Sequence, residues 1–186
     1  KEWAVTVKAL ERGETALIVR KGGIREKAFA VEDSRFLLLP GYEHQRPELI
    51  KPEFREVLGE LPERDDTGPL YFSSFAEVVG AYEISEKEEL DALDEHHMWT
   101  SEYAESRFKW RPKKPLTVLV LRTRLLPEEV VLPFREEYGG CRSWIQLKEP
   151  VSTGGATPVL SDEEFEQLVS GARSALEGLA PARIGL

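Results

Sequence analysis

The chain has 186 residues, 41% of them hydrophobic, and a formal net charge of −9 at pH 7. This length and composition fit one globular domain with a real hydrophobic core. The acidic balance argues against a broad basic surface that grips a phosphate backbone over a long footprint, although it leaves a local basic patch open. Cys141 is the only cysteine, which excludes an internal disulfide and a zinc site built from several thiolates. We therefore expect a soluble protein of the reducing cytoplasm with no membrane partner.

Short apolar segments that predict β-strands dominate the beginning of the chain. Residues 3–10 and 15–21 are rich in β-branched side chains, and we expect them to form a hairpin. Residues 29–31 and 36–39 predict two further short strands, the second of which ends at Pro40.

The middle of the chain alternates helical and strand-like patterns. A helix is expected from Pro52, because proline is tolerated at the first helical position. Residues 70–84 predict one long or two broken strands, with Gly80 as a candidate bulge. Ser85 is expected to cap the next helix, and residues 101–108 predict another.

The second half contains the most strand-like stretch, residues 116–126. We expect Leu119 and Leu121 on one face of this strand, and Val118, Val120, Arg122 and Arg124 on the other. The two arginines either pair with acids or line a basic groove. Residues 129–132 and 143–148 predict shorter strands.

The pattern as a whole predicts an α+β fold, because the strands are interrupted by helices without regular alternation. We favour a small, partly open β-barrel over residues 1–150, followed by a linker over residues 151–160. Residues 161–186 contain a capping box and an amphipathic helix. This C-terminal helix is expected to pack on the domain or on a partner, for example in a homodimer.

The densest polar motif follows the predicted strand of residues 15–21. It combines basic side chains, a carboxylate and two glycines, namely Arg20, Lys21, Gly22, Gly23, Arg25 and Glu26. Turn amides with lysine and arginine can hold an anion, and a lysine beside a carboxylate can transfer protons. The alternative is a charged hairpin end that only keeps a sheet edge soluble.

A second polar motif, Tyr42-Glu43-His44-Gln45, follows the strand of residues 36–39. It gathers hydrogen-bond donors and acceptors with one titratable imidazole. The alternative is a capped strand end in which His44 merely bonds backbone.

Aromatic and basic residues interleave in a third segment that includes Trp99, Tyr103, Arg107 and Trp110. Such a pattern suits a pocket that stacks a base and contacts phosphate. The alternative is that the aromatic side chains are core and the arginines lie over them. The adjacent histidines at residues 96–97 point about 100° apart on a helix and do not chelate one metal ion. We expect no metal site and no cofactor.

Several of these segments resemble the bacterial and archaeal domain-of-unknown-function family 1802. The resemblance rests on residues 1–5, 20–24, 36–45, 99–110 and 138–141. It covers most of residues 1–150 and implies no activity.

A more distant resemblance is to the PUA-like barrels, which include the ASCH and EVE domains. It rests on Lys21 with Arg25 and Glu26, on the apolar strand of residues 36–39, and on the later strand pair. Members of that superfamily often bind RNA or a modified base, and some hydrolyse modified nucleosides. The resemblance therefore implies nucleic-acid or nucleotide handling.

Together these features predict a pocket for RNA, DNA or a nucleotide. Its wall is expected to include Arg20, Gly22, Gly23, Tyr42 and Gln45, which belong to the first two motifs. Lys21, Arg25 and Arg107 would contact phosphate. Trp99 or Trp110 would stack on a base, and Glu43 with His44 would read its edge.

Whether the protein is an enzyme stays open at this level. In an enzyme, Glu26 or Glu43 would be the base and Lys21 the electrophilic partner in the hydrolysis of a modified nucleoside. Two other classes are kept as alternatives. One is a metal-dependent nuclease that uses Asp33 and Glu43, and the other is a non-catalytic protein-interaction module.

Overall fold

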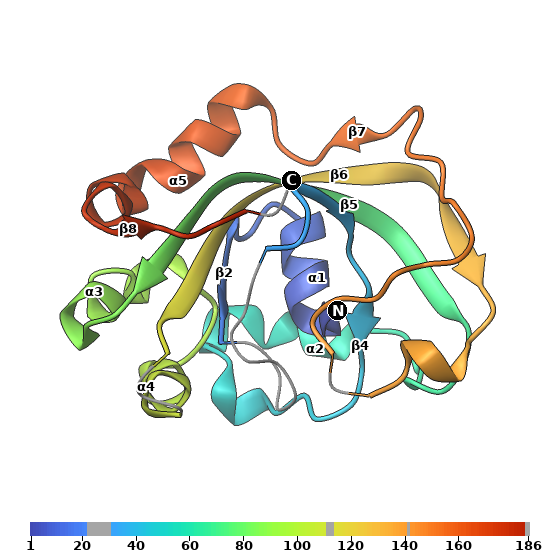
Figure 1. Ribbon diagram of the computed structural model, residues 1–186, viewed down its shortest axis with the longest axis horizontal. Coiled ribbons are helices and arrows are strands. Elements are labelled where there is room, and N and C mark those ends of the chain that lie inside the picture. Colours follow the sequence, from blue (N-terminus) through green and yellow to red (C-terminus); the bar gives the residue numbers. More distant parts are fainter. Residues whose placement is uncertain (22–30, 111–113, 141, 185–186) are drawn as a thin grey trace.

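Two long antiparallel strands, β5 (Leu70–Ile84) and β6 (Leu116–Leu132), pair along nearly their whole length and arch across the molecule (Figure 1). The computed structural model describes residues 1–21, 31–110, 114–140 and 142–184. β2 (Leu17–Arg20) joins the outer side of β6, and β3 (Arg35–Leu37) joins β5. The resulting order is β2-β6-β5-β3, with every neighbour antiparallel.

Four very short strands complete the pairing. β7 (Thr157–Pro158) pairs with β6, and β8 (Ala180–Pro181) pairs with β5, which makes the sheet six-stranded. β1 (Glu2–Trp3) and β4 (Pro40–Gly41) form a separate parallel pair. The fold is therefore mixed α and β with a mostly antiparallel sheet, and within the described residues this sheet does not close on itself.

The bend of the sheet coincides with two irregularities of strand pairing. The register of β5 against β6 shifts between Phe72 and Ser74, and again between Val78 and Gly80. Extra residues of this kind bend a strand and increase its local twist. A Cβ atom on Gly80 would lie 2.7 Å from the Tyr82 ring, so a larger residue would have to displace that ring. The predicted bulge at Gly80 is confirmed.

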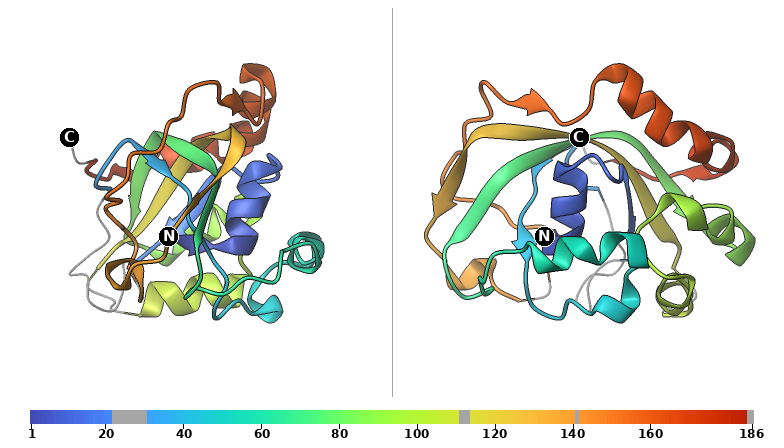
Figure 2. Two further views of the ribbon diagram at one scale, coloured as in Figure 1. Left: turned by 90° about the vertical axis from the view of Figure 1, so that its right-hand side faces the viewer. Right: turned by 180° about the vertical axis from the view of Figure 1, so that it is seen from behind.

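The concave side of the arch holds α1 (Ala4–Glu11), which overturns the predicted hairpin (Figures 1 and 2). Residues 3–10 were expected to form a strand, but all of α1 except Lys8 and Glu11 is buried. A segment that is apolar on nearly every side has no clear period of 2 or 3.6, and short apolar runs are ambiguous for that reason. Packing beneath the sheet selects the helix.

The convex side holds α5 (Asp162–Glu177), which begins at the predicted capping box. Ser161 accepts a hydrogen bond from the Glu164 amide, and Glu164 accepts one from the Ser161 amide. The predicted alternation of β6 is also confirmed: Val118 and Val120 pack in the core cluster that includes α5, whereas Leu119 and Leu121 pack in the cluster that includes α1. The apolar face of α5 is thus buried within its own chain.

The remaining helices are short and flank the sheet. They are η1 (Pro47–Leu49), η2 (Pro52–Phe54), α2 (Glu56–Gly59), α3 (Lys87–Asp91), η3 (Asp94–His96), α4 (Ser101–Lys109) and η4 (Glu136–Tyr138). The helix predicted from Pro52 is thus a 3₁₀ turn followed by one turn of α-helix, and the cap of α3 is Glu86 rather than Ser85. The helices among the described residues are all too short or too polar to cross a membrane.

Three of the predicted short strands differ from the observed secondary structure. Residues 129–132 belong to the single long strand β6. Residues 143–148 form neither helix nor strand, because their apolar side chains are anchored separately, as described below. Of residues 29–31, only Val31 lies within the described part, where it forms an isolated bridge with Ile184.

His97 is an unusual buried side chain beside α4. It is 2% exposed, and both of its ring nitrogens lack a hydrogen-bond partner. Burial, together with the nearby Lys51 ammonium, lowers the pKa of His97 to about 4. The imidazole is therefore held neutral, because a charged ring would be buried without solvation.

We expect His97 to make the protein less stable in mild acid. Its pKa is about 4 in the folded protein and 6.5 in the reference state, so the unfolded chain binds the proton first as the pH falls. The free energy of unfolding should fall by about 2 kcal/mol between pH 7 and pH 5 from this residue alone. Urea unfolding of the parent and of His97→Leu at both pH values checks this. An equal loss in the two proteins would contradict it.

Packing of α5 on the convex face should contribute strongly to stability. Phe165 is buried in the cluster formed with β6, and Phe165→Ala should lower the free energy of unfolding by about 3 kcal/mol. Ser174→Ala on the exposed side of the same helix is the matched control and should change it by about 0.5 kcal/mol or less. Denaturant unfolding measures both. Similar small effects would mean that α5 does not share the core.

Candidate functional site

A cavity of about 380 Å³ lies on the concave side of the sheet. Its apolar floor comes from three strands, through Ile18 of β2, Phe72 of β5 and Leu119 of β6. Residues 143–151 run along its other side. Ligand pockets usually occupy about 300–1,000 Å³, so the cavity has room for a small organic molecule.

The irregular segment of residues 143–151 is anchored by its side chains. Ile145, Leu147 and Val151 pack in the cluster that contains Phe72. Trp144 contacts the Phe36 ring, with centroids 4.9 Å apart and planes at 88°. These contacts hold the segment over the sheet without a strand ladder.

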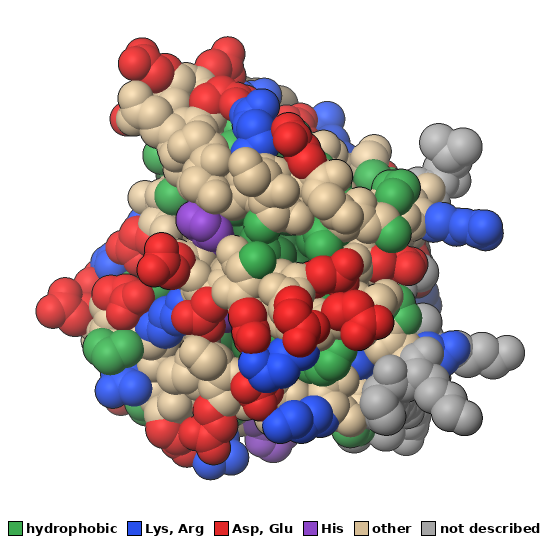
Figure 3. Space-filling model, turned by 90° about the vertical axis from the view of Figure 1, so that its left-hand side faces the viewer, with side chains coloured by type: hydrophobic (Ala, Val, Ile, Leu, Met, Phe, Trp, Pro, Cys, Tyr) green, Lys and Arg blue, Asp and Glu red, His purple; other side chains and the backbone are tan. Residues whose placement is uncertain are grey.

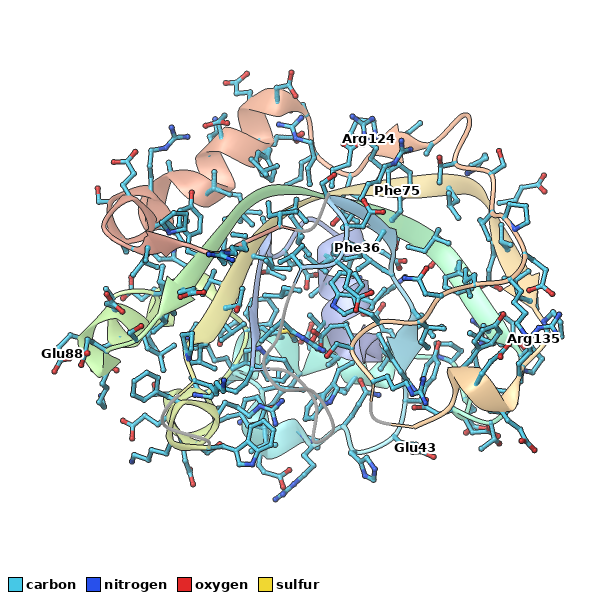
Figure 4. The ribbon with its side chains drawn as sticks, in the orientation of Figure 1. Phe36, Glu43, Phe75, Glu88, Arg124 and Arg135 are labelled. Atoms are coloured by element: carbon cyan, nitrogen blue, oxygen red, sulfur yellow. The ribbon has the colours of Figure 1, made fainter. Side chains whose placement is uncertain are left out.

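Phe36 and Trp144 form an aromatic corner within the cavity lining. Phe36 lies beneath the arch, toward the middle of the molecule (Figure 4). Because the two rings are perpendicular, a flat ligand ring that stacks on one of them would lie perpendicular to the other, which is the orientation of an edge-to-face contact. Both arrangements are favourable between aromatic rings.

Arg20 connects β2 to the other side of the cavity. Its Nη1 donates to Glu2 Oε2 at 2.5 Å, and its Nη2 donates to Ser143 Oγ at 2.9 Å. All three residues line the cavity. Arg20 therefore lines the cavity, and its guanidinium already bonds Glu2 and Ser143.

The cavity mouth carries acidic and amide groups. Glu32 and Asp33 are exposed, and Gln146 Nε2 donates to Glu32 Oε2 at 3.4 Å across the opening. Arg35 lies beside them, where its guanidinium is 4.3 Å from the Phe75 ring centroid and donates to Thr153 Oγ1 at 2.8 Å. The mouth therefore offers hydrogen-bond acceptors from two separate segments.

Lys21, predicted to share a site with Arg20, is directed elsewhere. Successive side chains of a strand point to opposite faces, and Lys21 is not among the residues that line the cavity. It is 2% exposed, and its Nζ donates to Phe108 O at 2.9 Å in the last turn of α4. This bond satisfies a carbonyl that has no partner within the helix. Burial, and then the charge of Arg107, lowers the pKa of Lys21.

The aromatic segment is partly core. Trp99 is 5% exposed and packs against Trp3 and Tyr103, with ring centroids 5.0 and 4.8 Å away. Arg107 lies between Tyr103 and Trp110, 5.7 and 5.6 Å from their ring centroids. The structure thus brings Lys21, Arg107 and the aromatic segment together at α4, but Trp99 presents little surface for stacking.

The second polar motif is divided between structural and exposed positions. The Tyr42 amide donates to Asp66 Oδ1 at 2.7 Å, and Gln45 Oε1 accepts from the Val5 amide at 2.8 Å in the first turn of α1. Gln45 therefore satisfies an amide that the helix leaves unpaired. Burial raises the pKa of Tyr42.

Glu43 and His44 lie outside the cavity lining. His44 Nε2 lies 3.8 Å from Glu43 Oε2, and both side chains are exposed. In Figure 4 Glu43 lies at the lower edge of the molecule, well apart from Phe36. The residues that line the cavity include neither of them.

The remaining candidate residues are the rest of the first polar motif, the single cysteine and the two arginines of β6. Gly22, Gly23, Arg25, Glu26 and Cys141 lie outside the described residues. Arg122 and Arg124 pair with acids: Arg122 with Asp162, and Arg124 Nε with Glu77 Oε2 at 2.9 Å. The alternative of a basic groove on β6 is therefore wrong.

The described part of the chain offers no set of side chains for a metal-dependent active site. No group of three His, Cys, Asp or Glu residues there could hold a metal ion. Asp33 lines the cavity, whereas Glu43 is not one of its lining residues. The two acids of the nuclease hypothesis are not brought together.

Sequence reasoning missed several cavity residues. Glu2, Gln146 and the ring of Trp144 were not assigned to a site, because residues 143–148 resembled a strand and residues 3–10 a hairpin. The usable signal was a tryptophan followed by a polar amide, shortly after Gly139-Gly140. Binding residues are disproportionately found on loops that a rigid scaffold positions.

Comparison with known proteins gives a family and no activity. No curated protein and no solved structure matches the chain significantly. The model of a protein family described as Domain of unknown function (DUF1802) matches residues 1–171, which confirms the resemblance drawn from the motifs. The chain belongs to this family.

Proposed function

We propose that this protein binds a nucleoside or nucleotide in the cavity, either as a free small molecule or as one unit of a nucleic acid. The single observation that carries the proposal is the aromatic corner of Phe36 and Trp144, which stands beside acceptor groups in a cavity of about 380 Å³. Mostly apolar pockets with a few converging polar groups are the usual sites of small ligands.

Stacking supports a flat heteroaromatic ligand. Stacking of a base on an aromatic side chain contributes about 1–3 kcal/mol and works for every base, because each has a π-face. The apolar floor of Ile18 and Leu119 would exclude water beneath such a ring. Trp144 is partly buried, is anchored against Phe36 and lines the cavity.

The polar side chains at the cavity mouth, which we call the rim, support recognition of a base through hydrogen bonds to its edge. Glu32, Asp33 and Gln146 present carboxylate and amide groups at the mouth. Bases are distinguished through hydrogen bonds to their exposed edges. The rim therefore suits selection among bases.

The charge distribution favours one nucleotide unit over a long strand. The face over α3 and α4 carries a band of acidic side chains (Figure 3). Such a surface repels a phosphate backbone, whose binding depends on many basic contacts. The resemblance to PUA-like barrels agrees with this proposal, because members of that superfamily often bind RNA or a modified base.

Trp144→Leu should weaken binding of adenosine, adenosine monophosphate or a short single-stranded RNA by about tenfold, through loss of stacking. Isothermal titration calorimetry measures each affinity. Trp110→Leu is the matched control, because Trp110 lies on the α4 side and does not line the cavity. Circular dichroism and thermal unfolding verify that both variants are folded.

The three ligands distinguish binding of a free nucleoside or nucleotide from binding of one unit within a nucleic acid. Tight binding of the mononucleosides would indicate a free small molecule, and binding of the oligonucleotide alone would indicate a unit of nucleic acid. The proposal is wrong if none of the three ligands binds, or if Trp110→Leu weakens binding while Trp144→Leu does not.

A further inference from the structure

We infer that the cavity selects a positively charged flat ring, and specifically a nucleobase made cationic by N-methylation. This inference rests on the proposed function and specifies its ligand class. It follows from which charges around the cavity are already neutralised and which are not.

Of the three basic side chains in the described lining, two pair with an acid. Arg20 pairs with Glu2 at 2.5 Å, and the Lys1 ammonium lies 2.6 Å from Asp66 Oδ2. Arg35 lies against the Phe75 ring and donates to Thr153. A phosphate group would have to compete with these contacts, so the cavity is poorly prepared for an anion.

Of the four acidic side chains in the described lining, two pair with a basic residue and two do not. Glu2 pairs with Arg20, and Glu149 pairs with Arg135, whose hydrogen bond lowers the pKa of Glu149. Glu32 and Asp33 form no ion pair with any Lys or Arg of the described chain. Among the described lining residues, two carboxylates without an ion pair thus stand against one such guanidinium, that of Arg35, which leaves a net negative charge there.

The position of Glu32 connects this charge to the aromatic corner. Gln146 Nε2 donates to Glu32 Oε2 at 3.4 Å, and Gln146 lies two residues after Trp144. A carboxylate is thus held at the mouth of the cavity whose wall carries the Trp144 ring. Asp33 follows directly in sequence and adds a second negative charge.

A cationic ring would interact favourably both with the Trp144 ring and with the two carboxylates at the mouth. The face of an aromatic ring attracts a cation, most strongly for tryptophan, and more so when water is excluded. A neutral base would gain the stacking alone, whereas a cationic base would also gain attraction to Glu32 and Asp33. An N-methylated base such as 1-methyladenine combines the flat ring, the positive charge and an N–H donor.

The decisive comparison uses two isomers of one composition. 1-Methyladenosine is a cation at neutral pH because it holds one additional proton, whereas N6-methyladenosine is neutral, and the two have the same non-hydrogen atoms. We expect 1-methyladenosine to bind at least about tenfold more tightly at pH 7 and low salt. Isothermal titration calorimetry on the full chain measures both, with adenosine and adenosine monophosphate as references.

A charge-removing variant tests the residues. Glu32→Gln with Asp33→Asn removes both charges and keeps one acceptor oxygen at each position, so it should reduce the preference for 1-methyladenosine over N6-methyladenosine to about twofold or less. Glu43→Gln is the matched control, since it removes an exposed carboxylate that does not line the cavity. It should leave the preference intact.

The outcomes separate this inference from the proposed function. Equal affinities for the two isomers, or tighter binding of adenosine monophosphate than of 1-methyladenosine, would overturn the inference while nucleoside binding stands. A preference that survives in the double variant would also overturn it. Failure of all four ligands to bind would overturn both.

Discussion

The pairing of β5 with β6 is the constraint on which the rest of the molecule depends. These strands carry the bulges that bend the sheet, and the bend creates a concave and a convex side. Their register decides which side chains reach which side, since a slip of one residue exchanges the two faces of a strand. Leu119 then faces α1 and the cavity, and Val118 faces α5.

The cavity lies between the concave side of the sheet and an irregular segment of the chain. α1 occupies one part of the concave side, and residues 143–151 cover another without forming a strand. Contacts of Trp144 with Phe36, and of Ser143 with Arg20, hold that segment in place. The cavity lining thus brings together segments more than 100 residues apart in the sequence.

Polar residues that suggested chemistry often satisfy backbone groups instead. Lys21 bonds a carbonyl in the last turn of α4, and Gln45 bonds an amide in the first turn of α1. Helix ends expose unpaired backbone groups, and burying them without partners costs free energy. Polar residues at strand exits are therefore ambiguous from sequence, because nearby helix ends compete for the same side chains.

Local patterns by themselves determined the alternation of β6, the bulge at Gly80, the capped helix α5 and the family, since each depends on neighbours along the chain. Tertiary structure alone decided that residues 4–11 are helical, because an evenly apolar segment takes the conformation that its burial site accepts. It also decided that Arg20 lines the cavity whereas Lys21 bonds α4, and that Trp144 contacts Phe36. A cavity is a relation between distant segments, and no local pattern specifies which of them meet.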